Sequence, residues 1–125
     1  MLSQYDIAVA LPASDLERAR DFYEKTLGFE PEVGEGGTTY RSGNAALFLY
    51  PSQFAGTNKA TAAAWGVEDI EDVVDGLREK GVTFEEYDFE GLTTENGIAT
   101  LGDGTRSAWF TDTEGNILAV TQSDG

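Results

Sequence analysis

The side chains that could carry out chemistry in this sequence are carboxylates, tyrosines and arginines, because the chain contains no histidine and no cysteine. Without these two residue types there is no imidazole acid or base, no thiolate nucleophile and no Ser-His-Asp arrangement. Disulfides and metal sites with imidazole or sulfur ligands are excluded as well. Only cations that accept oxygen ligands, such as Mg²⁺ or Ca²⁺, remain compatible with the composition.

A reaction without a metal would have to use the remaining acids and bases. Asp6, Tyr40 and Arg41 are the candidates, since a buried carboxylate or phenol can be tuned for proton transfer. No diagnostic spacing pairs these three residues. The sequence therefore offers candidates for acid–base work and no catalytic motif.

The chain carries 23 acidic and 8 basic residues in 125, a formal net charge of −15. Such a surface repels phosphate backbones, so we expect no nucleic-acid partner. The acidity favours either a cationic ligand or simple solubility in a salt-rich or acid-tolerant source. No apolar run is long enough to cross a membrane and no leader peptide is recognisable, so we expect a cytoplasmic protein without a membrane partner.

The elements that must position these residues repeat at an offset of about 54 residues. Residues 8–28 and 62–81 both indicate a strand, a turn and a helix that ends at a glycine. Asp15-Leu16-Glu17 in the first copy corresponds to Asp69-Ile70-Glu71 in the second. The repeat predicts one domain, residues 1–125, built from modules 1–58 and 59–125.

Alternation of apolar residues and turn signals predicts the strands of each module. Ser14 and Glu17 form a predicted capping box at the start of the first helix. The expected strands are 5–11, 29–33, 38–42 and 45–50, then 62–67, 82–87, 97–101, 106–111 and 117–121, with a loop at 88–96. The pattern is βαβββ twice, an α+β fold, and we expect the concave faces of the two curved sheets to enclose a cleft.

Two stretches of this sequence resemble the vicinal-oxygen-chelate superfamily, which includes glyoxalase I, extradiol dioxygenases, fosfomycin-modifying enzymes and bleomycin-resistance proteins. The first is residues 12–19 with Phe22-Tyr23 and residues 27–29. The second is residues 108–110 followed by the turn 112–116. The resemblance implies a cupped, incomplete β-barrel with helices outside, and it leaves the reaction open because one fold hosts several chemistries.

Enzymes of that superfamily hold a divalent metal with a histidine on the first strand and a glutamate on the last strand of each module. The corresponding positions here are Ala8, Ala62 and Ala119, with Leu47, or Phe48 in a register shifted by one, as the fourth. None of these side chains can bind a metal. We therefore expect no cofactor and no metal-dependent lyase or dioxygenase activity.

Three functions remain open. The first is a metal-free, bleomycin-resistance-like homodimer that binds a small, planar organic molecule in an apolar cleft, as in drug sequestration, with an acidic rim that favours a cationic guest. The second is a metal-independent isomerase or lyase, and the third is a structural or regulatory dimer with a vestigial pocket. The residues expected to line the cleft are Ala8, Tyr40, Leu47, Phe54, Ala62, Ser107, Trp109 and Ala119.

Overall fold

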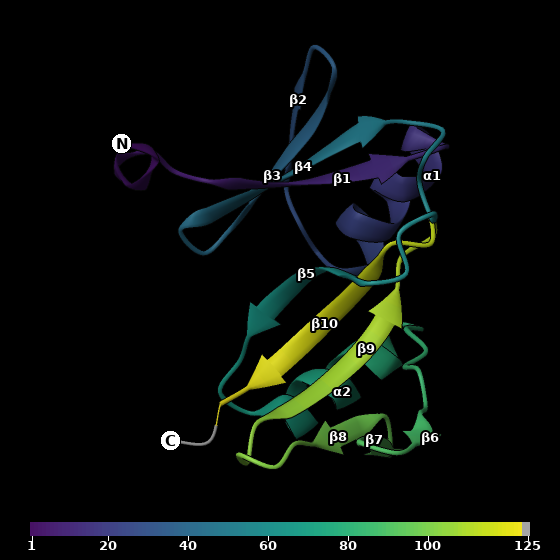
Figure 1. Cartoon of the computed structure of the whole chain (residues 1–125). Coiled ribbons are helices and arrows are strands. Elements are labelled where there is room, and N and C mark those ends of the chain that lie inside the picture. The colour runs from purple at the N-terminus through teal and green to yellow at the C-terminus, as the bar shows by residue number, and fades with distance from the viewer. Residues whose placement is uncertain (124–125) are drawn as a thin grey trace.

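The computed structural model describes residues 1–123 and contains two β-sheets, each with one helix against it (Figure 1). The first sheet has the strand order β1-β4-β3-β2, with β1 parallel to β4. Its strands are β1 (Ala8–Ala13), β2 (Pro31–Gly34), β3 (Gly37–Ser42) and β4 (Ala45–Pro51). The connection from β1 to β2 contains helix α1 (Leu16–Asp21), which continues in the wider turns of η2 (Phe22–Thr26).

The second sheet repeats this order and adds a hairpin, giving β5-β10-β9-β8-β7-β6. Helix α2 (Ile70–Glu79) follows the first of its strands. The strands are β5 (Thr61–Gly66), β6 (Asp88–Phe89), β7 (Leu92–Glu95), β8 (Ile98–Thr100), β9 (Arg106–Thr111) and β10 (Ile117–Gln122). The fold is thus α+β with two sheets and no closed barrel among the described residues, consistent with the cupped, incomplete barrel that the sequence predicts.

The second half differs from its prediction between the helix and β8. Residues 82–87, expected as a strand, make only the isolated bridge Phe84 to Phe110, and residues 88–96, expected as a loop, contain the β6–β7 hairpin. Gly91 has a φ of 89°, and a glycine at this turn can take that left-handed conformation without strain. The chain therefore turns back on itself in a region where polar residues and glycine suggested irregular structure.

One face of each sheet carries the helix and is buried, which we call the helix face. Side chains from the helix faces of both sheets belong to a single apolar cluster. Its largest fully buried side chains are those of Leu11, Tyr23, Tyr40, Leu49, Ile70, Val74, Phe110 and Leu118. The two halves of the chain are therefore joined through their helix faces.

The side chains of the opposite face of each sheet, which we call the open face, do not belong to this apolar cluster in the part of the chain that the structure describes. Alternation along paired strands places Ala8, Ala10 and Phe48 on the first open face, and Ser107, Trp109 and Ala119 on the second. We expected the two concave faces of one chain to meet across a cleft. That expectation is wrong for a single chain. The larger apolar side chains lie on the helix faces, and their burial joins the two halves through these faces.

The chain begins with a short apolar segment that lies outside the sheets. The single helical turn η1 (Leu2–Gln4) contains no buried residue, and Figure 1 shows this segment extending away from the rest of the fold. The first strand was expected at 5–11, but β1 starts at Ala8, where pairing with Ala46 begins. Neither helix nor any other helical segment in residues 1–123 is long and apolar enough to cross a bilayer.

Candidate functional site

The turn between β9 and β10 holds a buried carboxylate that joins the two halves of the chain. Asp112 Oδ2 accepts a 2.6 Å hydrogen bond from Tyr23 Oη, and Asp112 Oδ1 accepts from the backbone amides of Glu114 and Asn116 at 2.8 and 2.9 Å. Asn116 Nδ2 also donates to the carbonyl oxygen of Pro12 at 2.9 Å. Burial and the negative charge of Asp112 raise the pKa of the Tyr23 phenol well above its usual value, so the phenol remains a donor.

Glu114, in the same turn, is held by four neighbours around the start of α1. Its side chain is shielded from solvent and accepts from Arg18 Nε at 2.8 Å and from the Asp15 amide at 2.9 Å. Thr113 Oγ1 and Ser14 Oγ donate to the same carboxylate at 2.8 and 3.1 Å. Burial acts to raise the pKa of this carboxyl, but the hydrogen bonds from Arg18, Asp15, Thr113 and Ser14 outweigh it and hold the pKa at about 2.

These contacts correct the predicted capping box. Asp15 is the N-cap of α1, accepting from the Arg18 amide, while the Ser14 hydroxyl is directed to Glu114. Asp69 caps α2 in the same way through the Asp72 amide. No buried side-chain nitrogen or oxygen in residues 1–123 lacks a hydrogen-bond partner, so this cluster leaves no buried polar side-chain atom unpaired. Its role is to fix the two halves together.

The open face of the second sheet has a floor of small residues and a wall of aromatic rings. Ala119 lies between Ala64 on β5 and Trp109 on β9, and Ser107 lies between Ala99 and Thr121. Ser107 and Thr121 share a 3.0 Å hydrogen bond through their hydroxyl groups. These small side chains form a flat apolar surface beside a partly exposed indole.

Tyr87 completes the aromatic wall of this face. Its ring meets that of Trp109 edge-to-face at 5.7 Å, and Phe89 meets Tyr87 in the same manner at 5.9 Å. The Trp109 indole donates to Thr61 Oγ1 at 3.2 Å, which fixes the ring orientation. Tyr87 was not predicted as a site residue, although alternation along the expected strand 82–87 puts it on the same face as Glu85 and opposite to Phe84.

The open face of the first sheet carries a second aromatic surface. The rings of Phe48 and Tyr50 are stacked nearly parallel, with centroids 6.0 Å apart and planes inclined by 8°. The Phe48 ring extends over Gly37 on β3, where a Cβ atom would approach Phe48 Cζ to 2.9 Å. The absence of a side chain at Gly37 therefore leaves space for the Phe48 ring. We call the stacked rings of Phe48 and Tyr50 the Phe48 platform.

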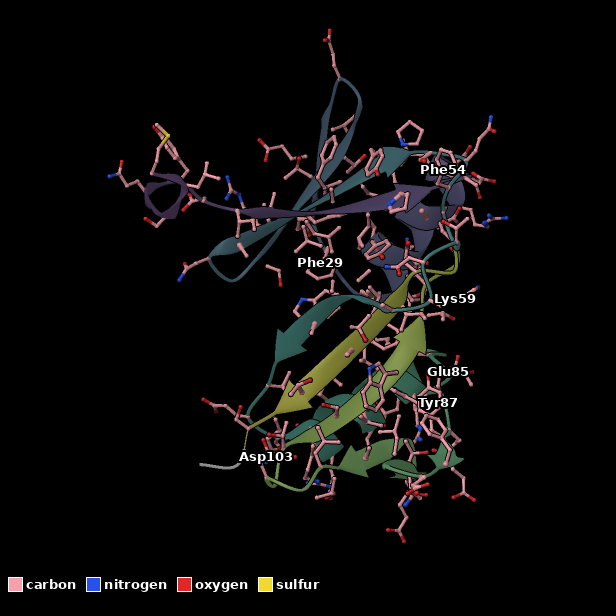
Figure 2. The ribbon with its side chains drawn as sticks, viewed as in Figure 1. Phe29, Phe54, Lys59, Glu85, Tyr87 and Asp103 are labelled. Carbon is pink, nitrogen blue, oxygen red and sulfur yellow. The ribbon has the colours of Figure 1, made fainter. Side chains whose placement is uncertain are left out.

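The structure places the eight expected cleft residues in different environments. Ser107, Trp109 and Ala119 come together on the second open face, and Ala8 lies exposed on the first. Phe54 follows β4 with 77% of its surface exposed, and Figure 2 shows it at the first sheet, whereas Tyr87 lies at the second.

Tyr40, Leu47 and Ala62 lie on the helix faces instead, which corrects their expected place in the open cleft. Tyr40 is fully buried and its hydroxyl donates to Glu24 at 2.8 Å, while Leu47 is buried in the core and touches a groove between the halves. The pairing of Val9 with Leu47 puts Phe48 on the same face as Ala8, so the shifted register is the correct one. A β-bulge between Thr61 and Ala63 turns Ala62 against the core.

The three acid–base candidates do not converge. Tyr40 points into the core, and Arg41, the next residue along β3, points to the open face. Asp6 lies in the exposed segment before β1. Burial and the Glu24 carboxylate raise the pKa of the Tyr40 phenol, which keeps it protonated and structural.

Comparison of the sequence with models of known protein families identifies the family of this chain. The model of the Glyoxalase/Bleomycin resistance protein/Dioxygenase superfamily matches residues 7–120. The chain belongs to this superfamily. No curated protein sequence matches the chain.

Solved structures of this superfamily share the fold at low sequence identity. A glyoxalase/bleomycin resistance protein from Catenulispora acidiphila is 21% identical over 95% of this chain and 98% of its own, with a TM-score of 0.70. An antibiotic binding protein from a Streptomyces species is 21% identical over 96% of both chains, with a TM-score of 0.62. A lactoylglutathione lyase from Agrobacterium tumefaciens is 18% identical over 94% of this chain and 92% of its own, with a TM-score of 0.67.

The metal that many enzymes of the superfamily use does not fit the residues present here. The positions that the resemblance assigns to metal ligands carry Ala8, Phe48 and Ala119 on the open faces and Ala62 against the core, and none of these side chains has a donor atom. No three acidic side chains within residues 1–123 lie close enough together to hold a cation in their place. This superfamily member therefore has hydrocarbon and aromatic side chains at the positions where metal-dependent relatives have metal ligands.

Proposed function

We propose that this protein binds a small, planar organic molecule, and a cationic one in preference, in a groove that two copies close together. The observation that carries the proposal is the pair of aromatic surfaces on the two open faces. Phe48 and Tyr50 present two parallel, stacked rings, and Tyr87 with Trp109 presents an edge-to-face pair beside small residues. Such surfaces bind flat molecules by stacking.

A second copy is part of the proposal because the two aromatic surfaces of one chain face away from each other. The helix faces already share the core, so neither open face can turn toward the other without unpacking it. A homodimer that sets the first sheet of one copy opposite the second sheet of the other brings the two surfaces across one groove. The antibiotic binding protein among the similar structures supports a small-molecule guest.

The preference for a cation rests on the position of Glu85. The Glu85 amide donates to the carbonyl oxygen of Trp109 at 2.8 Å, and the adjacent bridge of Phe84 to Phe110 puts the Glu85 side chain on the open face. Figure 2 shows Glu85 and Tyr87 on the same side of the second sheet. No ion pair within residues 1–123 involves Glu85. A half-buried carboxylate beside aromatic rings favours a positively charged, flat guest.

The experiment uses the two tryptophans of the chain as separate reporters. Trp65 is packed against the core, where its indole donates to Ser42 Oγ at 2.9 Å, so the Trp65→Phe variant leaves Trp109 as the one tryptophan, which can be excited apart from the tyrosines. We expect saturable quenching of that variant by proflavine, a planar cation, and weaker quenching by acridine at a pH where acridine is neutral. The Trp109→Phe variant, with Trp65 as reporter, should show much less quenching.

Each outcome of this titration decides a part of the proposal. Absence of saturable quenching by either compound would overturn the binding function and favour a vestigial pocket. Equal affinity for proflavine and neutral acridine would overturn the cation preference alone. Quenching that is undiminished in the Trp109→Phe variant would place the guest beside Trp65 and away from the open face.

A further inference from the structure

A cavity of about 370 Å³ lies between α2 and the outer strands of the second sheet, on the helix face. One wall is a stripe of α2 within residues 71–78, and the other comes from the β7–β8 hairpin and the start of β9. Figure 1 shows α2 behind β9, with β8 and β7 continuing the sheet beyond the helix. A cavity of this volume has the room that small-molecule sites need.

The cavity has an apolar floor and a charged rim. Val74 on α2 and Ile98 on β8 line it and are buried. The other seven lining residues are polar, and five of them carry a formal charge. Hydrocarbon on one side and charges of both signs on the other suit a molecule that combines an apolar part with charged groups.

One pair of these charges is already neutralised. Arg106 Nη2 donates to Glu71 Oε1 at 2.7 Å and ties the start of α2 to β9. The structure of residues 1–123 contains no ion pair of Arg78, Asp75 or Glu95, which also line the cavity. The set without an ion pair is one cation and two anions, so a ligand that satisfies it carries charges of both signs.

The Arg78 side chain is held in place by the opposite wall. Its Nη2 atom donates to the carbonyl oxygen of Asn96 at 2.8 Å, and its guanidinium carbon lies 5.5 Å from the centre of the Phe84 ring. Gly97 comes next in this turn, and a Cβ atom there would approach Arg78 Nη2 to 2.9 Å. The glycine therefore leaves space for the guanidinium, whose remaining N–H groups can bind a carboxylate in the paired geometry.

We propose that this cavity binds a small zwitterion, an α-amino acid with an aliphatic side chain. Asp75 and Arg78 lie one turn apart on α2, a spacing at which Cβ atoms are about 5 to 6 Å apart. A ligand that meets both residues must hold its ammonium and carboxylate groups only a few bonds apart, as an α-amino acid does. The carboxylate pairs with Arg78 and the ammonium with Asp75, while Glu95 adds negative charge from the opposite wall. The aliphatic side chain lies on the apolar floor.

This cavity is separate from the groove of the proposed function. Ser107 and Trp109 alternate with Arg106 along β9, so the two sites use opposite faces of one sheet. The cavity is formed within a single chain. The inference therefore goes beyond the proposed function and needs neither a second copy nor a planar guest.

The test is a titration of the full chain with leucine, followed by the backbone amide signals of its NMR spectrum. Two analogues of leucine each lack one charge: isocaproate has no ammonium group, and isoamylamine has no carboxylate. We expect leucine to shift the amides of residues 71–78 and 95–100 saturably. Each analogue should bind roughly 10-fold more weakly or worse, because a hydrogen bond between charged groups is lost.

Matched variants locate the ligand. Arg78→Gln removes the partner of the carboxylate and should weaken leucine binding roughly 10-fold or more. Lys80→Gln removes a cation from the end of the same helix, outside the cavity, and should bind leucine as the parent does. Asp75→Asn keeps the size of an exposed side chain and should weaken binding several-fold, so it decides the question if the Arg78→Gln chain does not fold.

The inference is overturned by the absence of a saturable shift with leucine, by equal binding of leucine and either analogue, or by undiminished binding in the folded Arg78→Gln or Asp75→Asn chain. Shifts confined to the open face would overturn it as well, since they would place leucine in the groove of the proposed function. Leucine binding at residues 71–78 together with no quenching by proflavine would uphold the cavity and overturn the proposed function.

Discussion

Tyr23 and Asp112, which are 89 positions apart in the sequence, share a 2.6 Å hydrogen bond inside the core. The phenol comes from the helical segment after β1, and the carboxylate comes from the turn between β9 and β10. The bond therefore ties the first half of the chain to the second. It adds a polar contact to the apolar cluster through which the two halves are packed together.

Replacement of Tyr23 by phenylalanine should lower the free energy of unfolding by about 2 kcal/mol, the typical contribution of a hydrogen bond to a charged group. The ring keeps its stacking with Tyr40 at 5.8 Å, so the change isolates the hydroxyl. Asp112 Oδ2 would keep only the Asn116 Nδ2 donor. Urea denaturation monitored by circular dichroism measures the difference.

The matched control is Tyr5→Phe, because Tyr5 is 68% exposed in the segment before β1. Removal of the Tyr5 hydroxyl should leave the urea midpoint unchanged at concentrations where the chain is monomeric. If Tyr23→Phe and Tyr5→Phe have the same small effect, the phenol–carboxylate bond does not hold the halves together.

Glu114 should make the protein acid-sensitive over a defined range of pH. Its pKa is about 2 in the folded chain, below the ordinary value of 4.5 that applies after unfolding. A lowered pKa stabilises the folded state at pH values above 4.5, and this contribution is lost as the pH falls from about 4.5 toward 2. The difference in unfolding free energy between the parent and the Glu114→Gln variant should therefore shrink over that interval.

Glu90 serves as the comparison for Glu114, since it is exposed in the turn between β6 and β7. The Glu90→Gln variant should follow the pH dependence of the parent chain throughout. A difference between parent and Glu114→Gln that stays constant from pH 6 to pH 2 would contradict the assignment of the lowered pKa to the Arg18 and Asp15 contacts.

Local signals in the sequence predicted most of the fold because they rest on short-range physics. The repeat, the glycine after each helix and the alternation along β1, β4, β9 and β10 are properties of neighbouring residues. The register of β4 was open by one residue, and a shift of one reverses every side chain. Only pairing with β1 decided between Leu47 and Phe48.

The candidate site was harder to predict because its members meet through long-range packing. The bulge at Thr61 to Ala63 turns Ala62 to the core, and no pattern of residue types in that segment announces it. Tyr87 lies in a segment without regular pairing, so its approach to Trp109 depends on the path of the whole second sheet. Which face of each half would be buried also depended on the balance of apolar area over the complete chain.

Gly37 offers a test of the Phe48 platform that does not alter an aromatic residue. A Cβ atom at this position would collide with the carbonyl oxygen of Leu49 and with the Phe48 ring. The Gly37→Ala variant should lose about 2 kcal/mol of stability, as overpacked sites do. Under conditions where it remains folded, its affinity for proflavine should fall several-fold because the Phe48 ring is displaced from its stacked position beside Tyr50.

Gly34, the residue paired with Gly37 across β2 and β3, provides the control for the same change. A Cβ atom there meets no atom within 4 Å, and its φ lies outside the left-handed region. The Gly34→Ala variant should therefore keep its stability or gain a few tenths of a kcal/mol, since alanine restricts the unfolded chain. Its proflavine affinity should equal that of the parent. Equal affinities for all three chains would show that the Phe48 and Tyr50 platform takes no part in binding, even if Gly37→Ala is destabilised as expected.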